Sequence, residues 1–472
     1  MIVQQFFIKG IAHSSYLLAG SRTCAIVDPR RDVQIYLDAA RDLNRKITHI
    51  LETHLHADFV SGHLDLAEIT GATIYAPKSG ECKFDHIALS EGDIFEIEDM
   101  ELSVLETPGH TPEHICYVVA DKSRGTEPAG VFCGDTLFVG DVGRPDLFPG
   151  RARELASSLY DSLYEKLLSL PDFCEVYPAH GAGSLCGRSM GAKRTTTIGY
   201  ERQYNLALQF GDREEFIDSL TTDMPAAPDH FSRLSAINTD GPTLVRNLPD
   251  LEGLGPQEFS DRAENENTIV LDIRGYDSFG GQHIPGAHNI DLDSNFSTFA
   301  GWLLPPGKDT LLVAYDREKA AEATVQLRRV GHDQVVGYLD GSMLTWAMAG
   351  LPISHVHQLS TEELYNMGTG DHEMAIIDVR TPREYDNLHI EGAINIPLPD
   401  LRTRYEELDP DTTTALICGG GQRSSMGASI LKQHGFRRVF NVAGGMTGYS
   451  AAGYATECPM CSLPHGSRFL GE

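Results

Sequence analysis

An internal repeat in the second half of the chain restricts the fold more than any other feature. The stretch 271–290, LDIRGYDSFGGQHIPGAHNI, matches 377–396, IDVRTPREYDNLHIEGAINI, and 327–352 matches 431–456. In each copy, short apolar runs alternate with segments of helical spacing, which predicts an α/β unit. A repeat of this length marks two whole domains and excludes a solenoid built from short units.

The first half of the chain has no part in this repeat and must fold separately. Strand-like runs such as CAIVDP at 24–29 and ITHILETH at 47–54 alternate there with helix-like segments. The whole chain has 472 residues, too many for one ordinary core. We therefore expect an α/β multidomain protein with a first domain at 1–225, a polar, proline-rich linker at 226–254, repeat domains at 255–354 and 358–457, and a tail at 458–472.

Composition excludes several classes of partner. The formal net charge of −29 disfavours nucleic acid and anionic membrane surfaces. No apolar run reaches the roughly 20 residues of a membrane helix, and the N-terminal stretch does not resemble a signal peptide. The nine cysteines are unevenly spaced, which suits reduced thiols better than a disulfide framework. These features predict a cytoplasmic protein that binds neither nucleic acid nor membrane.

Residues typical of metal sites are concentrated in the first domain. The stretch THLHADF places His54, His56 and Asp58 directly after an apolar strand, and His110, Asp135 and His180 follow later strands. Side chains just past strand ends commonly form the sites of α/β sheets. A lone histidine in such a position would more often be structural, but several such turns in one domain favour a metal site.

At these residues the first domain resembles the metallo-β-lactamase superfamily. The resemblance implies an αβ/βα sandwich with metal held between its two sheets. Hydrolases of the superfamily carry THxHxDH and bind two metals, and the residue after the aspartate is a ligand of the second. Here that residue is Phe59, which has no donor atom. The resemblance therefore implies one metal ion, held by His54, His110 and Asp135.

Two histidines and one carboxylate form the arrangement of non-haem iron(II) oxygenases. The domain looks most like the persulfide dioxygenase branch of the superfamily, which implies one Fe(II) per chain. His56, Asp58 and His180 would then support the ligands or hold water, with His56 kept as a further candidate ligand. In GDVGRPDLFPG, Arg144 is a candidate for binding the thiol substrate, with an ordinary loop arginine as the alternative. Cys186 is a candidate sulfur relay, with a buried inert thiol as the alternative.

The last domain carries a cysteine in a glycine-rich loop. ALICGGGQRSSMGASIL at 415–431 predicts a strand, a loop and a helix, with Cys418 at the strand end and Arg423 at the helix start. Backbone N–H groups of such a loop can converge on the sulfur and stabilise a thiolate or persulfide anion. The loop resembles that of the rhodanese sulfurtransferases, which implies Cys418 as the sulfur-carrying nucleophile, Arg423 as a second catalytic residue, and a substrate-binding cradle of Gly419, Gly420, Gly421 and Gln422.

The first repeat departs from this pattern at the decisive position. Ala314 aligns with Cys418, and the loop YDREKAA replaces GGGQRSS. No cysteine lies between Cys186 and Cys418, so this domain cannot carry sulfur in the usual way. We expect a degenerate, pseudo-rhodanese domain that serves packing, docking or the shaping of a channel.

Together the domains resemble bacterial persulfide dioxygenase–rhodanese fusions. The resemblance implies oxidation of a small thiol persulfide with O2 to sulfite, followed by sulfur transfer that gives thiosulfate. The carrier thiol stays open among glutathione, coenzyme A, bacillithiol and cysteine, and a homo-oligomer, dimer or tetramer, is expected. The alternatives are a dinuclear zinc thioester hydrolase of the hydroxyacylglutathione type fused to a rhodanese, and a non-catalytic persulfide carrier or sensor. The tail carries Cys458 and Cys461, either a redox pair or a chain end without consequence.

Overall fold

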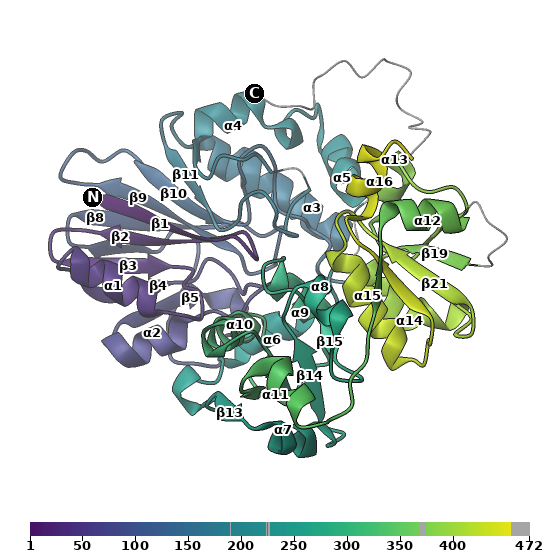
Figure 1. Ribbon diagram of the computed structural model, residues 1–472. Helices are drawn as coiled ribbons and strands as arrows, with labels where there is room; N and C mark the ends of the chain where they lie inside the picture. The colour runs from purple at the N-terminus through teal and green to yellow at the C-terminus, as the bar shows by residue number, and fades with distance from the viewer. Residues whose placement is uncertain (189, 223, 225–226, 369–373, 455–472) are drawn as a thin grey trace. The chain divides into compact units, whose positions relative to one another are not determined.

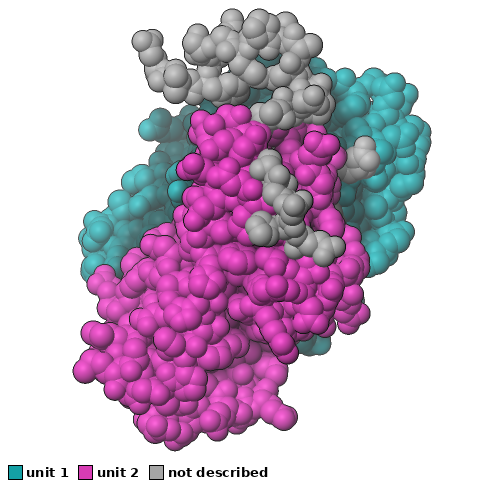
Figure 2. Space-filling model, turned by 45° about the vertical axis from the view of Figure 1, so that its right-hand side comes forward, with its two compact units in different colours: residues 1–248, 327–332 teal, residues 249–326, 333–472 magenta. Residues whose placement is uncertain are grey.

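The computed structural model describes residues 1–454 except 189, 223, 225–226 and 369–373. The predicted C-terminal tail, with Cys458 and Cys461, lies outside the described residues. The chain divides into two compact units (Figure 2). Unit 1 contains Met1–Leu248 and Leu327–His332, and unit 2 contains Pro249–Gln326 and the chain from Asp333 onward.

Unit 1 is built on two six-stranded sheets (Figure 1). The first has the order β1-β2-β3-β4-β5-β6 and the second the order β12-β11-β10-β9-β8-β7. The strands are β1 (Ile2–Ile8), β2 (His13–Ala19), β3 (Thr23–Val27), β4 (Lys46–Leu51), β5 (Thr73–Pro77), β6 (Ile87–Leu89), β7 (Ile94–Ile97), β8 (Met100–Glu106), β9 (Ile115–Asp121), β10 (Gly130–Gly134), β11 (Glu175–Pro178) and β12 (Thr196–Thr197). The helices are α1 (Gln34–Asp42), α2 (His63–Thr70), α3 (Ala152–Asp161), α4 (Ile198–Tyr204), α5 (Arg213–Thr221) and α6 (Phe231–Asp240).

Alternation along the strands explains why the two sheets stack. On β2, Tyr16 and Leu18 join a buried cluster with Leu102 and Val104 of the second sheet. The intervening Leu17 faces the other way and joins the cluster of α1 and α2. Successive strand residues point to opposite faces, so each sheet buries one face against its partner and the other under helices. The predicted αβ/βα sandwich is confirmed.

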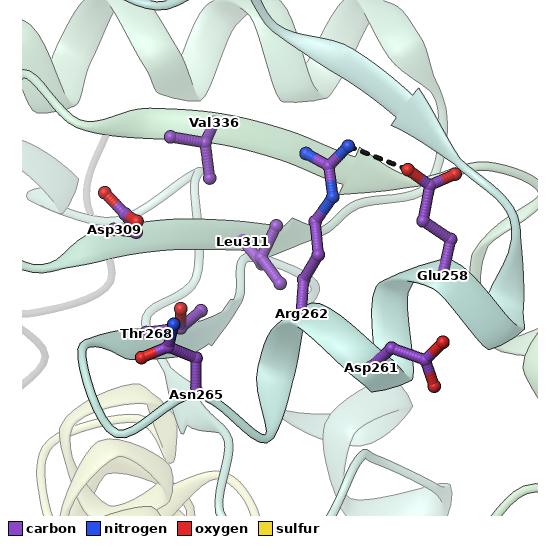
Figure 3. Close-up of a pocket in the computed structure, with 8 residues that line it drawn as sticks. All are labelled: Glu258, Asp261, Arg262, Asn265, Thr268, Asp309, Leu311 and Val336. Atoms are coloured by element: carbon purple, nitrogen blue, oxygen red, sulfur yellow. Dashed lines mark hydrogen bonds and ion pairs between the residues drawn. The ribbon is translucent and has the colours of Figure 1, made fainter.

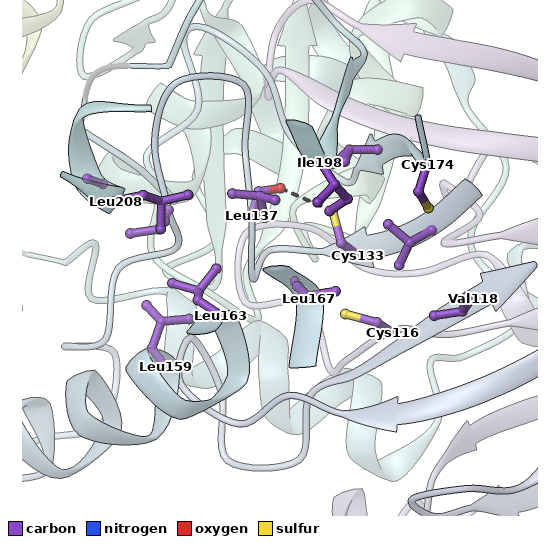
Figure 4. Close-up of a cluster of buried hydrophobic side chains, with 14 of the residues drawn as sticks. Cys116, Val118, Cys133, Leu137, Leu159, Leu163, Leu167, Cys174, Ile198 and Leu208 are labelled. Atoms are coloured by element: carbon purple, nitrogen blue, oxygen red, sulfur yellow. Dashed lines mark hydrogen bonds between the residues drawn. The ribbon is translucent and has the colours of Figure 1, made fainter. Parts of the chain in front are cut away.

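The outer face of the second sheet is covered by α3 and its neighbours (Figure 4). Cys116, Cys133 and Cys174 lie in this cluster, packed among Leu159, Leu163 and Leu167. Burial raises the pKa of Cys116 and Cys174 to about 12. A thiol with such a pKa stays protonated at neutral pH and is a weak nucleophile. These cysteines therefore contribute to the packing of the core.

Unit 2 contains two five-stranded parallel sheets with the same strand order. The first is β13-β17-β16-β14-β15 and the second is β18-β22-β21-β19-β20. The first group contains β13 (Glu252–Leu254), β14 (Thr268–Asp272), β15 (His288–Asn289), β16 (Asp309–Val313), β17 (Val335–Leu339), α7 (Pro256–Ala263), α8 (Tyr276–Gly281), α9 (Phe296–Leu303), α10 (Arg317–Arg329) and α11 (Ser342–Met348). The last residues of α10, from Leu327, are assigned to unit 1. The second contains β18 (His357–Leu359), β19 (Met374–Asp378), β20 (Ile394–Asn395), β21 (Thr413–Ile417), β22 (Val439–Val442), α12 (Thr361–Gly368), α13 (Pro382–Asn387), α14 (Leu398–Arg404), α15 (Gln422–Gln433) and α16 (Gly445–Ala451).

The repeat in the sequence thus corresponds to a repeat in topology. Asp272 pairs with Val313 in the first sheet as Asp378 pairs with Ile417 in the second. Each aspartate bonds the arginine two residues later, Arg274 or Arg380, so the matched D-x-R letters serve the same turn in both copies.

The stretch 226–254 differs from the open linker that its composition predicts. It contains α6, whose Phe231 and Leu234 are buried, and β13, which pairs with β17. Prolines at its start and end suggested a linker, but helical spacing of apolar residues between them lets α6 pack into unit 1. The structure describes no helix that is long and apolar enough to cross a membrane.

Candidate functional site

Three ligand-type side chains meet at the strand ends of unit 1. His54 follows β4, His110 lies in the loop between β8 and β9, and Asp135 follows β10. One donor atom from each lies within 4.8 Å of the others, and all three residues are buried. The Nε2 atoms of His110 and His54 lie 3.3 Å and 3.8 Å from Asp135 Oδ2. The structure brings together the set that the resemblance implied.

Hydrogen bonds fix which nitrogen of each imidazole carries the proton. Thr53 Oγ1 donates to Asp28, so it accepts from His54 Nδ1 at 2.9 Å. His110 Nδ1 lies 2.9 Å from the carbonyl oxygen of Arg144, which can only accept. Both rings therefore carry the proton on Nδ1 and present the Nε2 lone pair towards Asp135.

These two lone pairs fit a metal ion. Neither Nε2 has a hydrogen-bond partner among the described residues, and burial lowers the pKa of both imidazoles. A neutral imidazole with its other nitrogen held by a hydrogen bond is the form that binds metal.

Thr53→Val tests the hydrogen bond that orients His54. Valine keeps the shape of the side chain but cannot accept the hydrogen bond from His54 Nδ1, so this bond no longer fixes the tautomer of His54. We expect metal affinity to fall by roughly 10- to 100-fold, with the fold retained. Titration of the apoprotein with metal and thermal unfolding measure the two quantities. An unchanged affinity would show that His54 does not need Thr53.

His114 was missed by sequence reasoning and supports the same centre. The backbone N–H of Asp135 donates to His114 Nε2 at 2.9 Å, and His114 Nδ1 bonds Thr107. With Nε2 engaged, this ring cannot act as a ligand and instead holds the Asp135 backbone. The available signal was a second histidine in GHTPEH, four residues after His110.

His180 contacts the carboxylates of both Asp58 and Asp135. His180 Nε2 lies 2.8 Å from Asp58 Oδ2, and its Nδ1 lies 2.7 Å from Asp135 Oδ1. Burial lowers the pKa of His180, but the two carboxylates outweigh it, so the net pKa is raised well above its usual value. The ring links two carboxylates, which suits the supporting role that the sequence predicted.

His56 is grouped with carboxylates rather than with the three ligand residues. Its Nε2 lies 3.2 Å from Asp28 Oδ1, and Glu52 completes a second cluster of donor atoms. The ring still lies 4.0 Å from that of His54, centroid to centroid. His56 thus remains a candidate for a further ligand.

Phe59 fills the place where the hydrolases of the superfamily have a ligand. Its side chain is 0% exposed and packs with Ile8 and Ile11. Its ring centroid lies 4.1 Å from that of His13 and 4.4 Å from that of His56. An apolar ring therefore occupies space beside the histidines, and His13 is a neighbour that the sequence did not single out.

The backbone around Phe59 is held by α6. Asn238 Nδ2 donates to the carbonyl oxygens of His56 and Phe59, and Asn238 Oδ1 accepts from Ser61 N. Because this asparagine lies in the stretch predicted as a linker, sequence reasoning missed it.

Phe59→His restores a donor atom at this position. We expect the metal content to rise relative to the unaltered protein, because the added imidazole offers a second metal a ligand in the space that Phe59 fills. Phe59→Leu is the matched control, since it disturbs the packing without adding a donor. Elemental analysis of both variants is the measurement. Equal metal content in the two would show that Phe59 does not limit the number of metals.

Arg144 is placed differently from a free substrate-binding arginine. Its guanidinium is buried and pairs with Asp146 at 2.6 Å and 2.7 Å. Its carbonyl oxygen accepts from His110, a role that the sequence did not predict. The substrate-binding role stays a prediction.

Cys186 lies near the centre, in a cluster with Asp58 and His180. Burial, and then the charges of Asp58 and Asp135, raise the pKa of this thiol well above its usual value. A thiol that stays protonated is a weak nucleophile, so these surroundings oppose the relay role, which stays a prediction.

The loop of the second repeat forms a cradle around Cys418. The backbone N–H of Gly421 donates to Cys418 Sγ at 3.1 Å, and Ser424 Oγ lies 3.2 Å from it. Gly421 has a φ of +104°, which favours glycine there. Cys418 is 1% exposed, and its sulfur lies at the N-terminal end of α15, where backbone N–H groups favour an anion.

Arg423 is tied to a partner that sequence reasoning missed. Its guanidinium bonds both carboxylate oxygens of Glu384, at 2.7 Å and 2.8 Å. The bonds from Arg423 lower the pKa of Glu384 to about 2. The positive charge near the loop is therefore largely offset, and the catalytic role of Arg423 stays a prediction.

Ala314 occupies the equivalent position in the first repeat. It follows β16 as Cys418 follows β21, and both residues are 1% exposed. A methyl group thus stands where the second repeat has its sulfur.

A hollow of about 480 Å³ lies elsewhere in unit 2 (Figure 3). Thr268 and Asp309 line it at the amino ends of β14 and β16, opposite the edge that carries Ala314. Parallel sheets place their sites at the carboxyl ends of strands, so this hollow is unrelated to the rhodanese loop.

Comparisons with known proteins agree with this architecture. The model of the Metallo-beta-lactamase superfamily matches residues 8–180, and that of the Rhodanese-like domain matches 255–349 and 360–452. A hydroxyacylglutathione hydrolase of Pseudomonas aeruginosa is 35% identical over 164 residues, which are 34% of this chain and 58% of the relative. The chain thus spans little more than half of the hydrolases that it matches.

Other relatives are covered more fully. The mitochondrial persulfide dioxygenase ETHE1 of Mus musculus is 30% identical over 204 residues, 41% of this chain and 74% of the relative. The crystal structure of a metallo-beta-lactamase from Staphylococcus aureus is 35% identical, with a TM-score of 0.64, and covers 72% of this chain and 98% of its own. The chain belongs to the metallo-beta-lactamase superfamily, as a fusion in which two rhodanese-like domains follow the metallo-beta-lactamase domain.

Proposed function

We propose that the first domain is a mononuclear non-haem iron(II) persulfide dioxygenase. It would convert a small thiol persulfide, dioxygen and water into the thiol and sulfite. The observation that carries this proposal is the cluster of His54, His110 and Asp135 with Phe59 in place of a second-metal ligand. The likeness to ETHE1 supports the same assignment.

The residues around the cluster have defined tasks in this proposal. His54, His110 and Asp135 would hold iron(II), which would bring the persulfide sulfur and dioxygen together for oxidation. Thr53 and the Arg144 carbonyl hold the two imidazoles with their lone pairs inward. His180, between Asp58 and Asp135, holds a proton next to the centre. Phe59, Ile8 and Ile11 exclude water from one side.

The last domain would use the sulfite. The Cys418 thiolate attacks the outer sulfur of a second persulfide, the new S–S bond forms as the old one breaks, and the thiol leaves. Sulfite then attacks the outer sulfur of the Cys418 persulfide, which gives thiosulfate and restores the thiolate. Gly421 N–H and Ser424 Oγ lie where negative charge on Sγ needs donors.

A second candidate is a dinuclear zinc thioester hydrolase. The hydroxyacylglutathione hydrolases among the relatives favour it, as does the cluster of Asp58, His180 and Cys186, which offers donor atoms to another metal. We also propose that the protein is cytoplasmic, that it forms a homo-oligomer and that its persulfide substrate derives from a small thiol.

Oxygen uptake and metal analysis of one preparation distinguish the candidates. We expect about one iron per chain and oxygen consumption that requires a persulfide. The thiols to compare are glutathione, coenzyme A, bacillithiol and cysteine. Two zinc ions per chain, thioester hydrolysis and no oxygen uptake would support the hydrolase instead. Persulfide binding without turnover would support a carrier or sensor.

A further inference from the structure

In the degenerate repeat, the carboxyl ends of the strands form the sheet edge that corresponds to the edge carrying Cys418 in the second repeat. Tyr276, Asp291 and Tyr315 follow β14, β15 and β16 at the carboxyl ends of these strands. They gather around Gly275: a Cβ built there would lie 3.7 Å from the Tyr315 hydroxyl and 3.9 Å from Asp291 Oδ2. The hydroxyl of Tyr315 also bonds Ser278 Oγ at 2.9 Å. This edge therefore carries hydrogen-bonded polar side chains, but it has Ala314 at the position of the nucleophilic cysteine.

This edge lies against the active loop of the other repeat. Gln422 Nε2 donates to Asp291 Oδ2 at 3.1 Å, and the ring of Tyr276 is 3.2 Å from the place of a Cβ on Gly421. Beside them, Ser425 Oγ donates to Asn289 Oδ1 at 2.7 Å. In unit 2, β15 and α8 lie beside α15 (Figure 1). The degenerate repeat thus forms a wall next to the cradle of Cys418.

The charges at this wall have consequences for an anionic substrate. Arg423 is paired with Glu384, so its charge is offset, while Asp291 bonds the loop only through the neutral amide of Gln422. These three charged groups leave one net negative charge beside the loop, and Asp277, whose Oδ1 lies 2.9 Å from the place of a Cβ on Gly275, adds a further negative charge at this edge. A carboxylate repels a dianion more strongly than a monoanion at the same distance.

We propose that Asp291 is a specificity-determining residue of the Cys418 site and selects against doubly charged sulfur donors such as thiosulfate. This inference rests on the proposed sulfur transfer at Cys418. It gives the degenerate repeat a task, since thiosulfate, whose two charges both lie next to the reacting sulfur, would be disfavoured relative to a donor with one charge there. The same repulsion weakens binding of thiosulfate after it forms and, by the same factor, the approach of doubly charged sulfite.

The step that Asp291 affects is transfer of the outer sulfur. The Cys418 thiolate attacks the sulfane sulfur of the donor, an S–S bond forms, and the donor's own S–S bond breaks. From thiosulfate, sulfite leaves with the electron pair; from methanethiosulfonate, methanesulfinate leaves in the same way. These donors have similar shapes, but thiosulfate carries one more negative charge.

Asp291→Asn tests the proposal in the full-length protein. Asparagine keeps the Oδ1 that accepts from Asp293 N and removes the charge. With cyanide as acceptor, we expect kcat/KM for thiosulfate, relative to methanethiosulfonate, to rise about threefold or more, through KM. The gain should shrink with salt, because ions partly screen the repulsion between half-buried Asp291 and the substrate. Asp293→Asn is the matched control: it removes the same charge from an exposed side chain of the same turn.

The possible results distinguish a wrong assignment of Asp291 from a wrong assignment of Cys418. Equal changes for both donors, or the same gain in Asp293→Asn, would overturn the role of Asp291 and leave sulfur transfer intact. A wild-type protein that transfers sulfur from neither donor would overturn the function of Cys418 itself. Cys418→Ser sets the background rate.

Discussion

Replacing Cys418 by serine is expected to abolish sulfur transfer and leave oxygen uptake unchanged. Serine preserves the size of the side chain, so Gly421 N–H and Ser424 Oγ keep a neighbour in the cradle. Its hydroxyl stays protonated and cannot carry a sulfane sulfur as a persulfide. We expect a loss of roughly a thousandfold or more in transfer rate. With a persulfide substrate, sulfite should accumulate where the wild type gives thiosulfate.

Quantifying sulfite and thiosulfate together after thiol-reactive labelling checks this result. Ala314→Cys in the Cys418→Ser background is the matched control, because it places a thiol at the equivalent strand end of the other repeat. It should not rescue transfer, since YDREKAA lacks the glycines that turn N–H groups towards the sulfur. Thiosulfate formed at the wild-type rate by Cys418→Ser would contradict the assignment and direct attention to Cys186 and the tail cysteines.

Replacing His110 by alanine is expected to remove both the metal and oxygen uptake. The change deletes one of the converging donor atoms and leaves the carbonyl of Arg144 without its N–H partner. Loss of a ligand should weaken metal binding by at least about 100-fold, more than loss of a supporting hydrogen bond. The sandwich should still fold, because its core clusters do not include His110.

Iron content, oxygen consumption and thermal unfolding of the same preparation are the measurements. Sulfur transfer from methanethiosulfonate to cyanide serves as the internal control, since Cys418 lies in unit 2 and its loop is untouched. His110→Ala and Cys418→Ser should therefore lose opposite halves of the chemistry. Retained iron and full oxygen uptake in His110→Ala would remove this histidine from the ligand set.

The spacing of apolar residues and the internal repeat predicted the architecture, because both depend on local structure. Alternating apolar runs predicted the strands, and the matched stretches of the two repeats predicted two domains of one kind, in which Asp272 and Asp378 make equivalent turns. Candidate residues could be named for the same reason: His54, Asp135 and Cys418 each follow a buried strand closely enough for the strand end to fix their position. The comparison of Cys418 with Ala314 needed only an alignment of the two repeats.

The tertiary structure alone decided which groups meet these residues. The backbone carbonyl oxygen of Arg144 accepts a hydrogen bond from His110. Every residue has such a carbonyl group, so the residue type at position 144 does not predict this contact. Glu384 neutralises Arg423 from 39 residues away, and Asn238 holds the loop of Phe59 from a stretch whose composition resembled a linker. Asp291 meets Gln422 because two repeats pack within one unit. Hydrogen bonds and ion pairs require atoms to approach within about 3 Å, and that placement depends on how distant segments pack, which local periodicity does not specify.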